Sequence, residues 1–439
     1  MTIKLSTPLT LPCGATLPNT LAKASMTEGL ATPDGIASPQ LVRLYGLWSD
    51  GGCGLLLSGN IPIDRDHLER AGNVVLQDGK VEDAAAMEAL KSWTYAATRK
   101  GNHFWAQISH AGRQTQADIN PSPKAPSAAK IGLPVKFGIP QAMTIDEIHH
   151  TIDSFANAAK TCQDAGFTGV QLHAAHGYLL SSFLSPRANH RLDNYGGSLE
   201  NRARILLQAV KKARALVGPK FPISVKLNSA DFQKGGFQFQ DSLQVVQWLE
   251  EAGVDLIEIS GGNYEQAAMM NLEGLEAKEE QQVNRAPSTK AREAYFLDFA
   301  FAMQQKVTVP LMVTGGFRTR AAMEYALESG GADLIGLGRP LCVMTDGANQ
   351  LLEGKIDELP CYEDKLGLLP ASLSFLKRIQ LIKAVSSIGD LFWFYEQLEV
   401  LGQTGKPMEN LGTLRALICT ERLRVNQPSW TVLRDKFCN

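Results

Sequence analysis

The stretch PISVKLN (222–228), a helical pattern over 240–252 and then VDLIEIS (254–260) decide the fold class. Both short runs are apolar enough to be buried on two faces, which is typical of strands in a parallel sheet. Strand, helix and strand in this order form one β-α-β unit. The same alternation continues along the chain in both directions.

Six further runs follow the same plan: LAKASM (21–26), GLLLSG (54–59), HFWAQIS (103–109), TGVQLH (168–173), VPLMVTG (309–315) and ADLIGLG (332–338). Helical patterns occur at 39–50, 81–100, 144–165, 198–217, 288–306 and 319–330. About eight alternations of strand and helix are what a (β/α)8 barrel requires. The sequence therefore predicts the α/β class, with a TIM barrel architecture.

Two segments fall outside the barrel pattern. LTLPCGATLPN (9–19) has short runs around Cys13-Gly14, which predicts an N-terminal hairpin that plugs the barrel bottom. Near the other end, LFWFYEQLEVLG (391–402) has a helical pattern beyond what a barrel needs. We therefore expect a barrel domain over 1–345 and a helical extension over 346–439, packed on the barrel or at a subunit contact.

Two long connections follow predicted strands. Residues 121–141 are rich in proline and small residues, and residues 260–287 are polar. Loops of this length in a compact domain are usually functional, and both follow strand ends where barrels carry their chemistry. We expect the first to be a lid or a disordered loop on the active face, and the second to be a mobile substrate loop.

The composition narrows the class of protein. Lys and Arg total 43 against 45 for Asp and Glu in 439 residues, and a net charge of -2 provides no field for nucleic acid or anionic lipid. No run of about 18 apolar residues could span a bilayer. The start lacks a secretory pattern, and the 7 cysteines form no CxxC pair. These features predict a globular cytoplasmic protein and leave a homo-oligomer open.

Polar residues end each predicted strand, and in a barrel these ends form one ring. In chain order the ring contains Ser25, Thr27, Ser58, Asn60, Gln107, His110, His173, His176, Lys226, Asn228, Ser260, Thr314 and Arg339. Strands seven and eight end in TGGF (314–317) and GLGRP (336–340), where glycine N–H groups and Arg339 favour a bound phosphate. GLGRPL does not continue as GxGxxG, so a Rossmann site is not expected.

His173, His176 and Tyr178 lie just past the fourth strand. Two histidines and a tyrosine could polarise a carbonyl and deliver a proton. Zinc ligation by His173, His176 and His110 is the competing interpretation, although the cation Lys226 and the lack of acidic partners at other strand ends disfavour a metal. Histidines satisfied within the core are the remaining alternative.

Several motifs together resemble the old yellow enzyme family of FMN-dependent NADH:flavin oxidoreductases and ene-reductases. The most specific is HAAHGYLLSSFLSPRANHRLDNYGGSLENR (173–202), and the others are WAQISHAGRQ (105–114), VKLNSADF (225–232), VTGGF (313–317) and GLGRP (336–340). The resemblance covers roughly residues 3 to 345. The chain departs from the family pattern at two places. Thr27 stands where one branch of the family has a redox-tuning cysteine, and Gly59-Asn60 replaces an acidic residue followed by a small one.

The resemblance implies a role for each matching position. The flavin ring would lie among Ser25, Met26, Thr27, Asn60 and Gln107, with Lys226 near N1 and O2, and the phosphate would lie at Gly315, Gly316, Gly338 and Arg339. His173 and His176 would bind the activating oxygen of the substrate, and Tyr178 would protonate the alkene carbon.

The expected function is reduction of an activated alkene by NADH or NADPH through FMN, in a ping-pong cycle with one pocket for both partners. An NADH oxidase or quinone reductase using the same flavin is the first alternative. A metal-dependent barrel hydrolase is a less favoured one, and a catalytically silent flavin-binding scaffold is the last. No bound metal is expected.

Overall fold

The computed structural model describes residues 4–132, 137–260, 297–367, 380–408 and 410–416. Eight parallel strands close into a barrel in the order β10-β11-β12-β3-β4-β5-β8-β9. Their bounds are Leu21–Lys23 (β3), Leu55–Pro62 (β4), His103–Ser109 (β5), Gly169–Ala174 (β8), Ile223–Asn228 (β9), Leu256–Ser260 (β10), Leu311–Thr314 (β11) and Leu334–Leu337 (β12). The predicted TIM barrel is confirmed.

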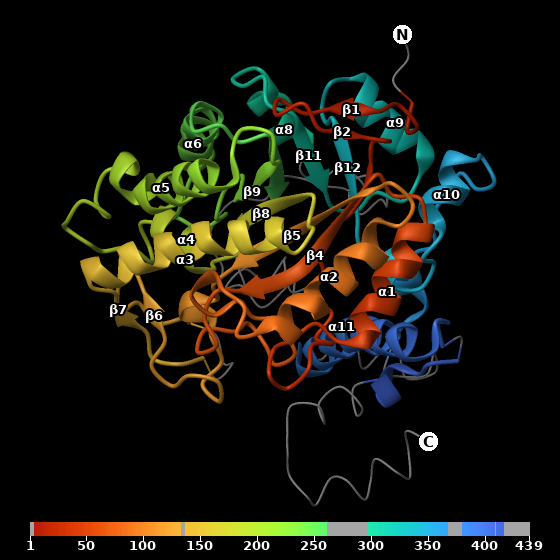
Figure 1. The fold of residues 1–439 in the computed structure, drawn as a ribbon, viewed down its shortest axis with the longest axis horizontal. Coiled ribbons are helices and arrows are strands. Elements are labelled where there is room, and N and C mark those ends of the chain that lie inside the picture. The colour runs from red at the N-terminus through yellow and green to blue at the C-terminus, as the bar shows by residue number, and fades with distance from the viewer. Residues whose placement is uncertain (1–3, 133–136, 261–296, 368–379, 409, 417–439) are drawn as a thin grey trace, which may run out of the picture.

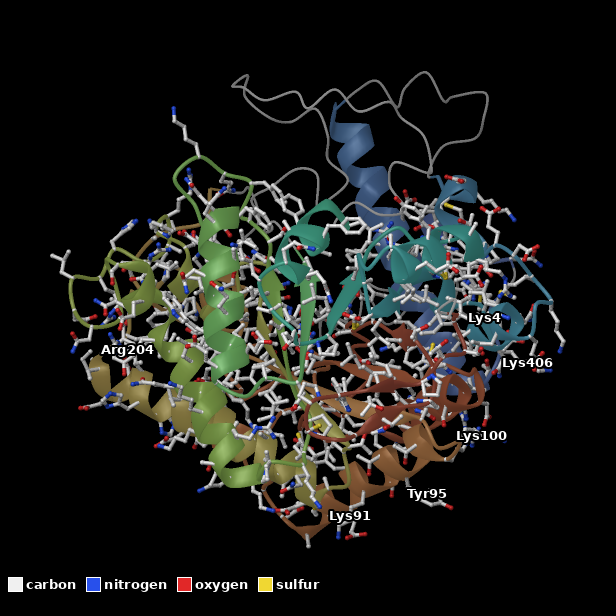
Figure 2. The ribbon with its side chains drawn as sticks, turned by 90° about the horizontal axis from the view of Figure 1, so that it is seen from above. Lys4, Lys91, Tyr95, Lys100, Arg204 and Lys406 are labelled. Atoms are coloured by element: carbon white, nitrogen blue, oxygen red, sulfur yellow. The ribbon has the colours of Figure 1, made fainter. Side chains whose placement is uncertain are left out.

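Helices surround the barrel, as Figure 1 shows. They are α1 (Pro39–Asp50), α2 (Ala84–Thr98), α3 (Ile145–Asp164), α5 (Leu199–Val217), α6 (Phe239–Glu251), α8 (Leu297–Gln304) and α9 (Arg320–Glu328). The predicted helix 288–306 is seen only from Leu297, because 288–296 lies outside the described residues. In Figure 2, Lys91 and Tyr95 of α2 point outward at the periphery, and Tyr95 is exposed.

Side chains at helix starts explain several boundaries. Thr144 and Glu147 form a reciprocal capping box at α3, and Ser198 accepts a hydrogen bond from the Asn201 N–H at α5. Each cap satisfies a backbone donor that has no partner within the helix. Asp146 lies in the first turn of α3, where a negative charge interacts favourably with the helix dipole.

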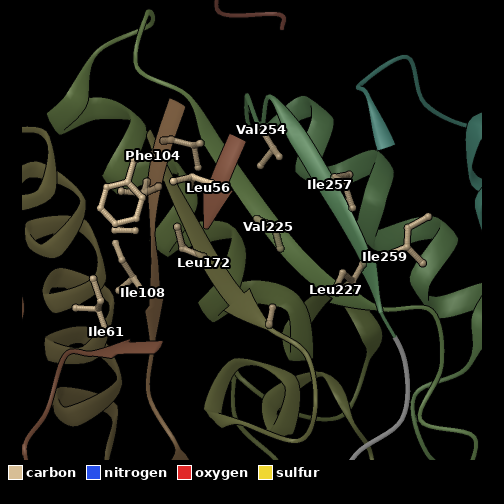
Figure 3. Close-up of a cluster of buried hydrophobic side chains, with 14 of the residues drawn as sticks. Leu56, Ile61, Phe104, Ile108, Leu172, Val225, Leu227, Val254, Ile257 and Ile259 are labelled. Atoms are coloured by element: carbon tan, nitrogen blue, oxygen red, sulfur yellow. The ribbon is translucent and has the colours of Figure 1, made fainter. Parts of the chain in front are cut away.

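The strands alternate between two apolar layers. Leu56, Phe104, Leu172, Val225 and Ile257 belong to the large cluster between strands and helices, which Figure 3 shows in close-up. Their neighbours in sequence face the barrel interior, where Leu55, Leu57, Trp105, Leu256, Met312 and Leu334 form a smaller cluster. This two-residue period is the one expected of strands.

The N-terminal hairpin is confirmed. Its strands β1 (Leu9–Thr10) and β2 (Thr16–Leu17) pair antiparallel around Cys13 and Gly14. Leu11 and Leu17 belong to the interior cluster of the barrel, so the hairpin closes one end with apolar side chains. Chemistry is therefore confined to the opposite end, where the strands end.

Two segments flank that opposite end in Figure 1. The predicted lid contains β6 (Lys124–Ala125), which pairs in parallel with β7 (Gln141–Ala142), so backbone pairing joins its two ends. Helix α11 (Gln380–Thr404) packs against α1, where Arg43 donates to the Gly402 carbonyl at 2.8 Å. The lid function and the domain boundary after residue 345 stay predictions.

Six short helices complete the described part of the chain, namely η1 (Gln77–Gly79), η2 (Gly112–Gln114), α4 (Leu179–Leu184), η3 (Arg339–Cys342), α10 (Gly347–Leu352) and η4 (Tyr362–Lys365). None of the described helices is long and apolar enough to cross a membrane. The predicted substrate loop at 260–287 lies outside the described residues, apart from Ser260.

Candidate active site

His173, His176 and Tyr178 lie together at the carboxyl end of β8. The His173 ring is 5.0 Å from the His176 ring and 4.7 Å from the Tyr178 ring, with edge-on contacts in both cases. His173 is the last residue but one of β8, and Tyr178 is the residue before α4. The structure thus brings the three predicted catalytic residues into one cluster.

The backbone fixes the tautomer of His173. Its Nδ1 accepts a hydrogen bond from the Ala175 N–H at 3.2 Å, so the proton of the neutral ring is on Nε2. Burial, with the nearby His176 and the Lys226 charge, lowers the pKa of His173 well below its usual value. His173 is therefore a neutral ring that can donate one hydrogen bond from Nε2.

His176 is held in a strained conformation by three neighbours. Its φ of 63° lies in the left-handed region, which few residues other than glycine adopt. Its N–H donates to Asn228 Oδ1 at 3.1 Å, its carbonyl accepts from Gln114 Nε2 at 2.7 Å, and its Nε2 lies 2.6 Å from Ser260 Oγ. Burial and the charge of Lys226 lower the pKa of His176 well below its usual value.

A layer of polar side chains crosses the barrel above its apolar floor. Ser25 Oγ donates to Gln107 Oε1 at 2.7 Å, and Gln107 Nε2 donates to Gln171 Oε1 at 2.7 Å. Gln171 Nε2 in turn donates to Glu258 Oε2 at 2.9 Å. Ser25 and Gln107, both predicted flavin contacts, are therefore rigidly oriented by their neighbours.

Lys226 ends this layer as half of an ion pair. It lies beside His173 in the register of β8 and β9, and its Nζ is 2.9 Å from Glu258 Oε1. The carboxylate also accepts from Thr314 Oγ1 at 2.8 Å. The motifs predicted the cation at Lys226 but not its partner Glu258. A carboxylate within the apolar run of β10 was a signal that could have found it, because buried charges require partners.

Glu69 is a second residue that sequence reasoning missed. Its carboxylate accepts hydrogen bonds from Asn60 Nδ2 at 2.5 Å and from the hydroxyls of Thr27 and Tyr178. These three donors come from separate parts of the chain, and the sequence predicted each of them separately as a site residue. Glu69 joins them from a loop after β4, where no periodic pattern marks it.

The replacement of the usual acidic residue by Gly59 has a local structural cause. The β4–β5 register shifts between Leu57 and Asn60, and a Cβ at Gly59 would lie only 2.2 Å from Glu28 Oε2. Glu28 is buried there and accepts from the Gly59 N–H at 2.9 Å. The bulge turns Asn60 toward Glu69 and pairs it in register with Gln107 on β5.

The predicted phosphate loops lie at the ends of adjacent strands β11 and β12. Gly315 and Gly316 have φ values of 147° and 78°, so side chains are disfavoured where backbone N–H groups are presented. Arg339 is 46% exposed and pairs with Glu363 at 3.0 Å. Burial alone would raise the pKa of Glu363, but Arg318 and Arg339 lower it.

Among the described residues, one cluster has three side chains that could together bind a metal ion, namely Asp64, His67 and His110. It includes neither His173 nor His176, so the predicted zinc set is not assembled. His67 Nε2 accepts from the Lys124 N–H at 2.8 Å and His110 Nδ1 accepts from the Gly112 N–H at 3.0 Å. The ring nitrogens that face Asp64 must therefore carry protons, whereas a metal requires them free.

The chain matches the model of the NADH:flavin oxidoreductase / NADH oxidase family over residues 4–358. This chain belongs to that family. It is 34% identical to the NADH-dependent flavin oxidoreductase iccE of Talaromyces variabilis, over 92% of this chain and 99% of the relative. It is 37% identical to the NADH-dependent flavin oxidoreductase iliE of Neonectria sp. (strain DH2), over 76% of this chain but only 45% of that longer relative.

Solved structures share the fold. An old yellow enzyme homologue from Zymomonas mobilis superposes with a TM-score of 0.66 at 24% identity, covering 84% of this chain and 97% of that one. A 2-naphthoyl-CoA reductase in complex with 2-naphthoyl-CoA superposes with a TM-score of 0.72 at 23% identity, covering 82% of this chain and 54% of that one. Because the chain belongs to this family, it is an oxidoreductase that uses FMN as its cofactor and NADH or NADPH as its hydride donor. The hydrolase alternative is therefore set aside.

The residues present fit FMN. Among the described side chains, Asn60 Oδ1 is buried without a hydrogen-bond partner, so an acceptor is available at the predicted ring position. A Cβ at Gly338 would meet only Met26 Sδ at 3.8 Å, which leaves room beside the phosphate loop. Arg339 presents a half-exposed cation at the same loop. The ring contacts and the phosphate contacts nonetheless stay predictions.

Proposed function

We propose that this enzyme reduces an activated alkene, such as an α,β-unsaturated carbonyl compound, in a ping-pong cycle. The observation that carries the proposal is the cluster of a neutral histidine with a fixed Nε2 donor, a second histidine and a tyrosine. A pair of donors suits a carbonyl oxygen that gains negative charge, and a phenol suits protonation of carbon.

The flavin would be held by the residues named for it. Ser25, Met26, Thr27, Asn60, Gln107 and Lys226 would surround its ring, and Gly315, Gly316, Gly338 and Arg339 would bind its phosphate. When bound, FMN supplies the hydride chemistry between NADH or NADPH and the alkene. The protein contributes orientation, oxyanion donors and a proton.

The two histidines would bind the substrate oxygen. His173 donates from Nε2, and it stays neutral because burial and the Lys226 charge disfavour its cation. His176 has Nε2 beside Ser260 Oγ, a hydroxyl that can donate to it and leave Nδ1–H as a donor, or accept from it. Hydrogen bonds of this kind strengthen as negative charge develops on the oxygen.

Tyr178 would then protonate the carbon next to the carbonyl. It is 2% exposed and packs against His173, so its hydroxyl acts where bulk water has little access. A phenol has an ordinary pKa near 10 and therefore holds its proton at neutral pH. Positioned acids of this kind contribute about 10² to 10⁴ in rate.

Quinone or oxygen reduction is the second candidate, and one observation favours it. The Tyr178 hydroxyl donates to Glu69, so the proposed acid is engaged before any substrate binds. A quinone needs no carbon protonation and would be reduced without it. A relative at 31% identity, from Thermoanaerobacter brockii, is named an NADH oxidase.

Anaerobic stopped-flow spectroscopy tests the proposal. NADH or NADPH should bleach the flavin of the wild-type protein, and cyclohexenone or a nitroalkene should restore the oxidised spectrum. Product analysis should show a saturated carbon–carbon bond. Reoxidation by menadione or oxygen alone, with no enone or nitroalkene consumed, would favour the second candidate.

A further inference from the structure

Glu69 lies in an irregular loop between β4 and η1 (Gln77–Gly79) that backbone contacts hold in place. The Ala31 N–H donates to the Gly72 carbonyl at 2.9 Å, and Asn73 Nδ2 donates to the Asn60 carbonyl at 3.2 Å. The loop is therefore fixed on both sides of Glu69. The carboxylate position follows from the fold and not from free side-chain motion.

The two carboxylate oxygens divide the contacts between them. Oε1 accepts from the Thr27 hydroxyl, whereas Oε2 accepts from Asn60 Nδ2 and from the Tyr178 hydroxyl. Asn60 and Thr27 thus orient the carboxylate, leaving Oε2 on the phenol. One donor on each oxygen, with the proposed acid on Oε2, is an arrangement for positioning a proton.

Tyr178 and Glu69 differ in their exposure to solvent. Tyr178 is buried, whereas Glu69 is only partly buried, and the two are hydrogen-bonded. A proton moving from solvent to the phenol therefore has a path through the carboxyl group. Without such a path, a buried phenol that loses its proton would have to regain it through the substrate pocket.

The charges around Glu69 support this path. Tyr178 is the titratable side chain that contacts the carboxylate among the described residues, and the His173 ring on its other side is neutral. The neighbouring Arg70 guanidinium lies over the Tyr395 ring of α11, at 4.0 Å. A phenolate formed beside an ionised Glu69 would face a like charge, which disfavours it.

We propose that Glu69 is the positioning residue of the proton donor and relays protons from solvent to Tyr178. This inference rests on the proposed alkene reduction. The hydride comes from NADH or NADPH by the established activity. The Tyr178 O–H bond breaks as a C–H bond forms on the substrate. The Glu69 carboxylate then takes a proton from solvent water, which leaves hydroxide in the solvent, and passes that proton to the phenolate.

The test uses the FMN-loaded full-length protein with Glu69→Gln. Gln keeps the shape and a carbonyl acceptor but carries no transferable acid proton. Steady-state reduction of cyclohexenone should slow by roughly 10- to 100-fold, less than for loss of the acid itself, because each turnover after the first depends on the restored Tyr178 proton. In the wild type this turnover should fall as the pH rises, because the relay draws its protons from solvent, and the fall should be absent in Glu69→Gln.

Asp66→Asn is the matched control, because it removes a carboxylate from an exposed position of the same loop. It should keep the wild-type rate and pH profile. Glu69→Asp retains a titratable carboxyl group and should keep a pH-dependent rate. If Glu69→Gln does not retain flavin, the Asp variant decides, because a turnover of Glu69→Asp that no longer varies with pH would contradict the relay.

A second measurement separates this inference from the proposed function. The absorbance titration near 295 nm, compared with that of Tyr178→Phe, isolates the phenol. The phenol should titrate at higher pH in the wild type than in Glu69→Gln, because the carboxylate favours the neutral form. Equal titrations would overturn the inference, whereas a wild type reoxidised by no enone would overturn only the alkene proposal.

Discussion

At the scale of single residues, the Tyr178 hydroxyl has one chemical task in the proposed reaction. Tyr178→Phe removes only that hydroxyl, so the barrel should fold and NAD(P)H should still bleach the flavin. Reoxidation by an enone should slow about 10² to 10⁴-fold, while reoxidation by a quinone should change little. Stopped-flow measurement of both half-reactions decides this. Equal slowing with both acceptors would show that Tyr178 only positions its neighbours.

His176 combines a proposed substrate contact with a strained backbone, and two variants separate these properties. Both His176→Asn and His176→Ala remove the imidazole donor, so both should raise the KM for the enone while flavin is retained. Only alanine should lower the unfolding free energy, by about 1 to 2 kcal/mol, because asparagine tolerates a φ of 63° far better. Urea unfolding measures this difference. Equal stability of the two variants would contradict the strain argument.

Single residues also mark where sequence reasoning reaches its limit. His173, His176 and Tyr178 could be predicted because they follow a recognisable strand. Glu69 could not, because its partners Thr27, Asn60 and Tyr178 are brought to it by loop geometry. Glu258 lies between these cases, since an acidic residue in an apolar strand predicts a buried partner but does not say which one.

At the scale of elements, the end of β12 meets the segment that follows the barrel. Arg339 pairs with Glu363 of η4, and its guanidinium lies 5.9 Å from the Phe394 ring of α11. If Arg339 binds the FMN phosphate, then Arg339→Ala should weaken FMN retention by about 1.5 to 3 kcal/mol.

Equilibrium dialysis followed by flavin absorbance measures this loss. Arg320→Ala is the matched control, because it removes the same charge from α9, where Arg320 pairs with Glu324 and Asp357. That variant should retain FMN as the wild type does. Unchanged FMN affinity in Arg339→Ala would place the phosphate elsewhere.

The order of the elements could be predicted because strand and helix repeat with distinct periods. Their ends were less predictable. β4 continues to Pro62 beyond the expected end at 59, because the bulge before Asn60 lets pairing with β5 resume. The pairing of β6 with β7 joins residues from two ends of a proline-rich segment, which composition alone does not reveal.

At the scale of the whole molecule, the barrel interior is divided along its axis. The hairpin and the inward residues near strand starts are apolar, and the next inward layer is a hydrogen-bonded network from Ser25 to Lys226. The proposed catalytic groups lie beyond that network at the strand ends. The apolar floor excludes water from one side, so the polar groups hold their orientation without competition from solvent.

The same burial makes global stability depend on pH. Burial lowers the pKa values of His110, His173 and His176 well below 6.5, so the unfolded chain binds protons that the folded chain refuses. Stability should therefore fall as the pH drops below about 6.5, by up to about 1.4 kcal/mol per pH unit for each histidine. Urea midpoints between pH 8 and 5, with FMN in constant excess, measure the slope. His173→Asn should reduce this slope by the contribution of one histidine, whereas His190→Asn, at an exposed position, should leave the slope unchanged.

Asp64 contributes to the pH dependence only at lower pH. Its pKa is lowered to about 2 because His67 outweighs the effect of burial, so the stability that it contributes is lost only below about pH 4. A flat profile from pH 8 to 5 would mean that these histidines take up protons in the folded protein.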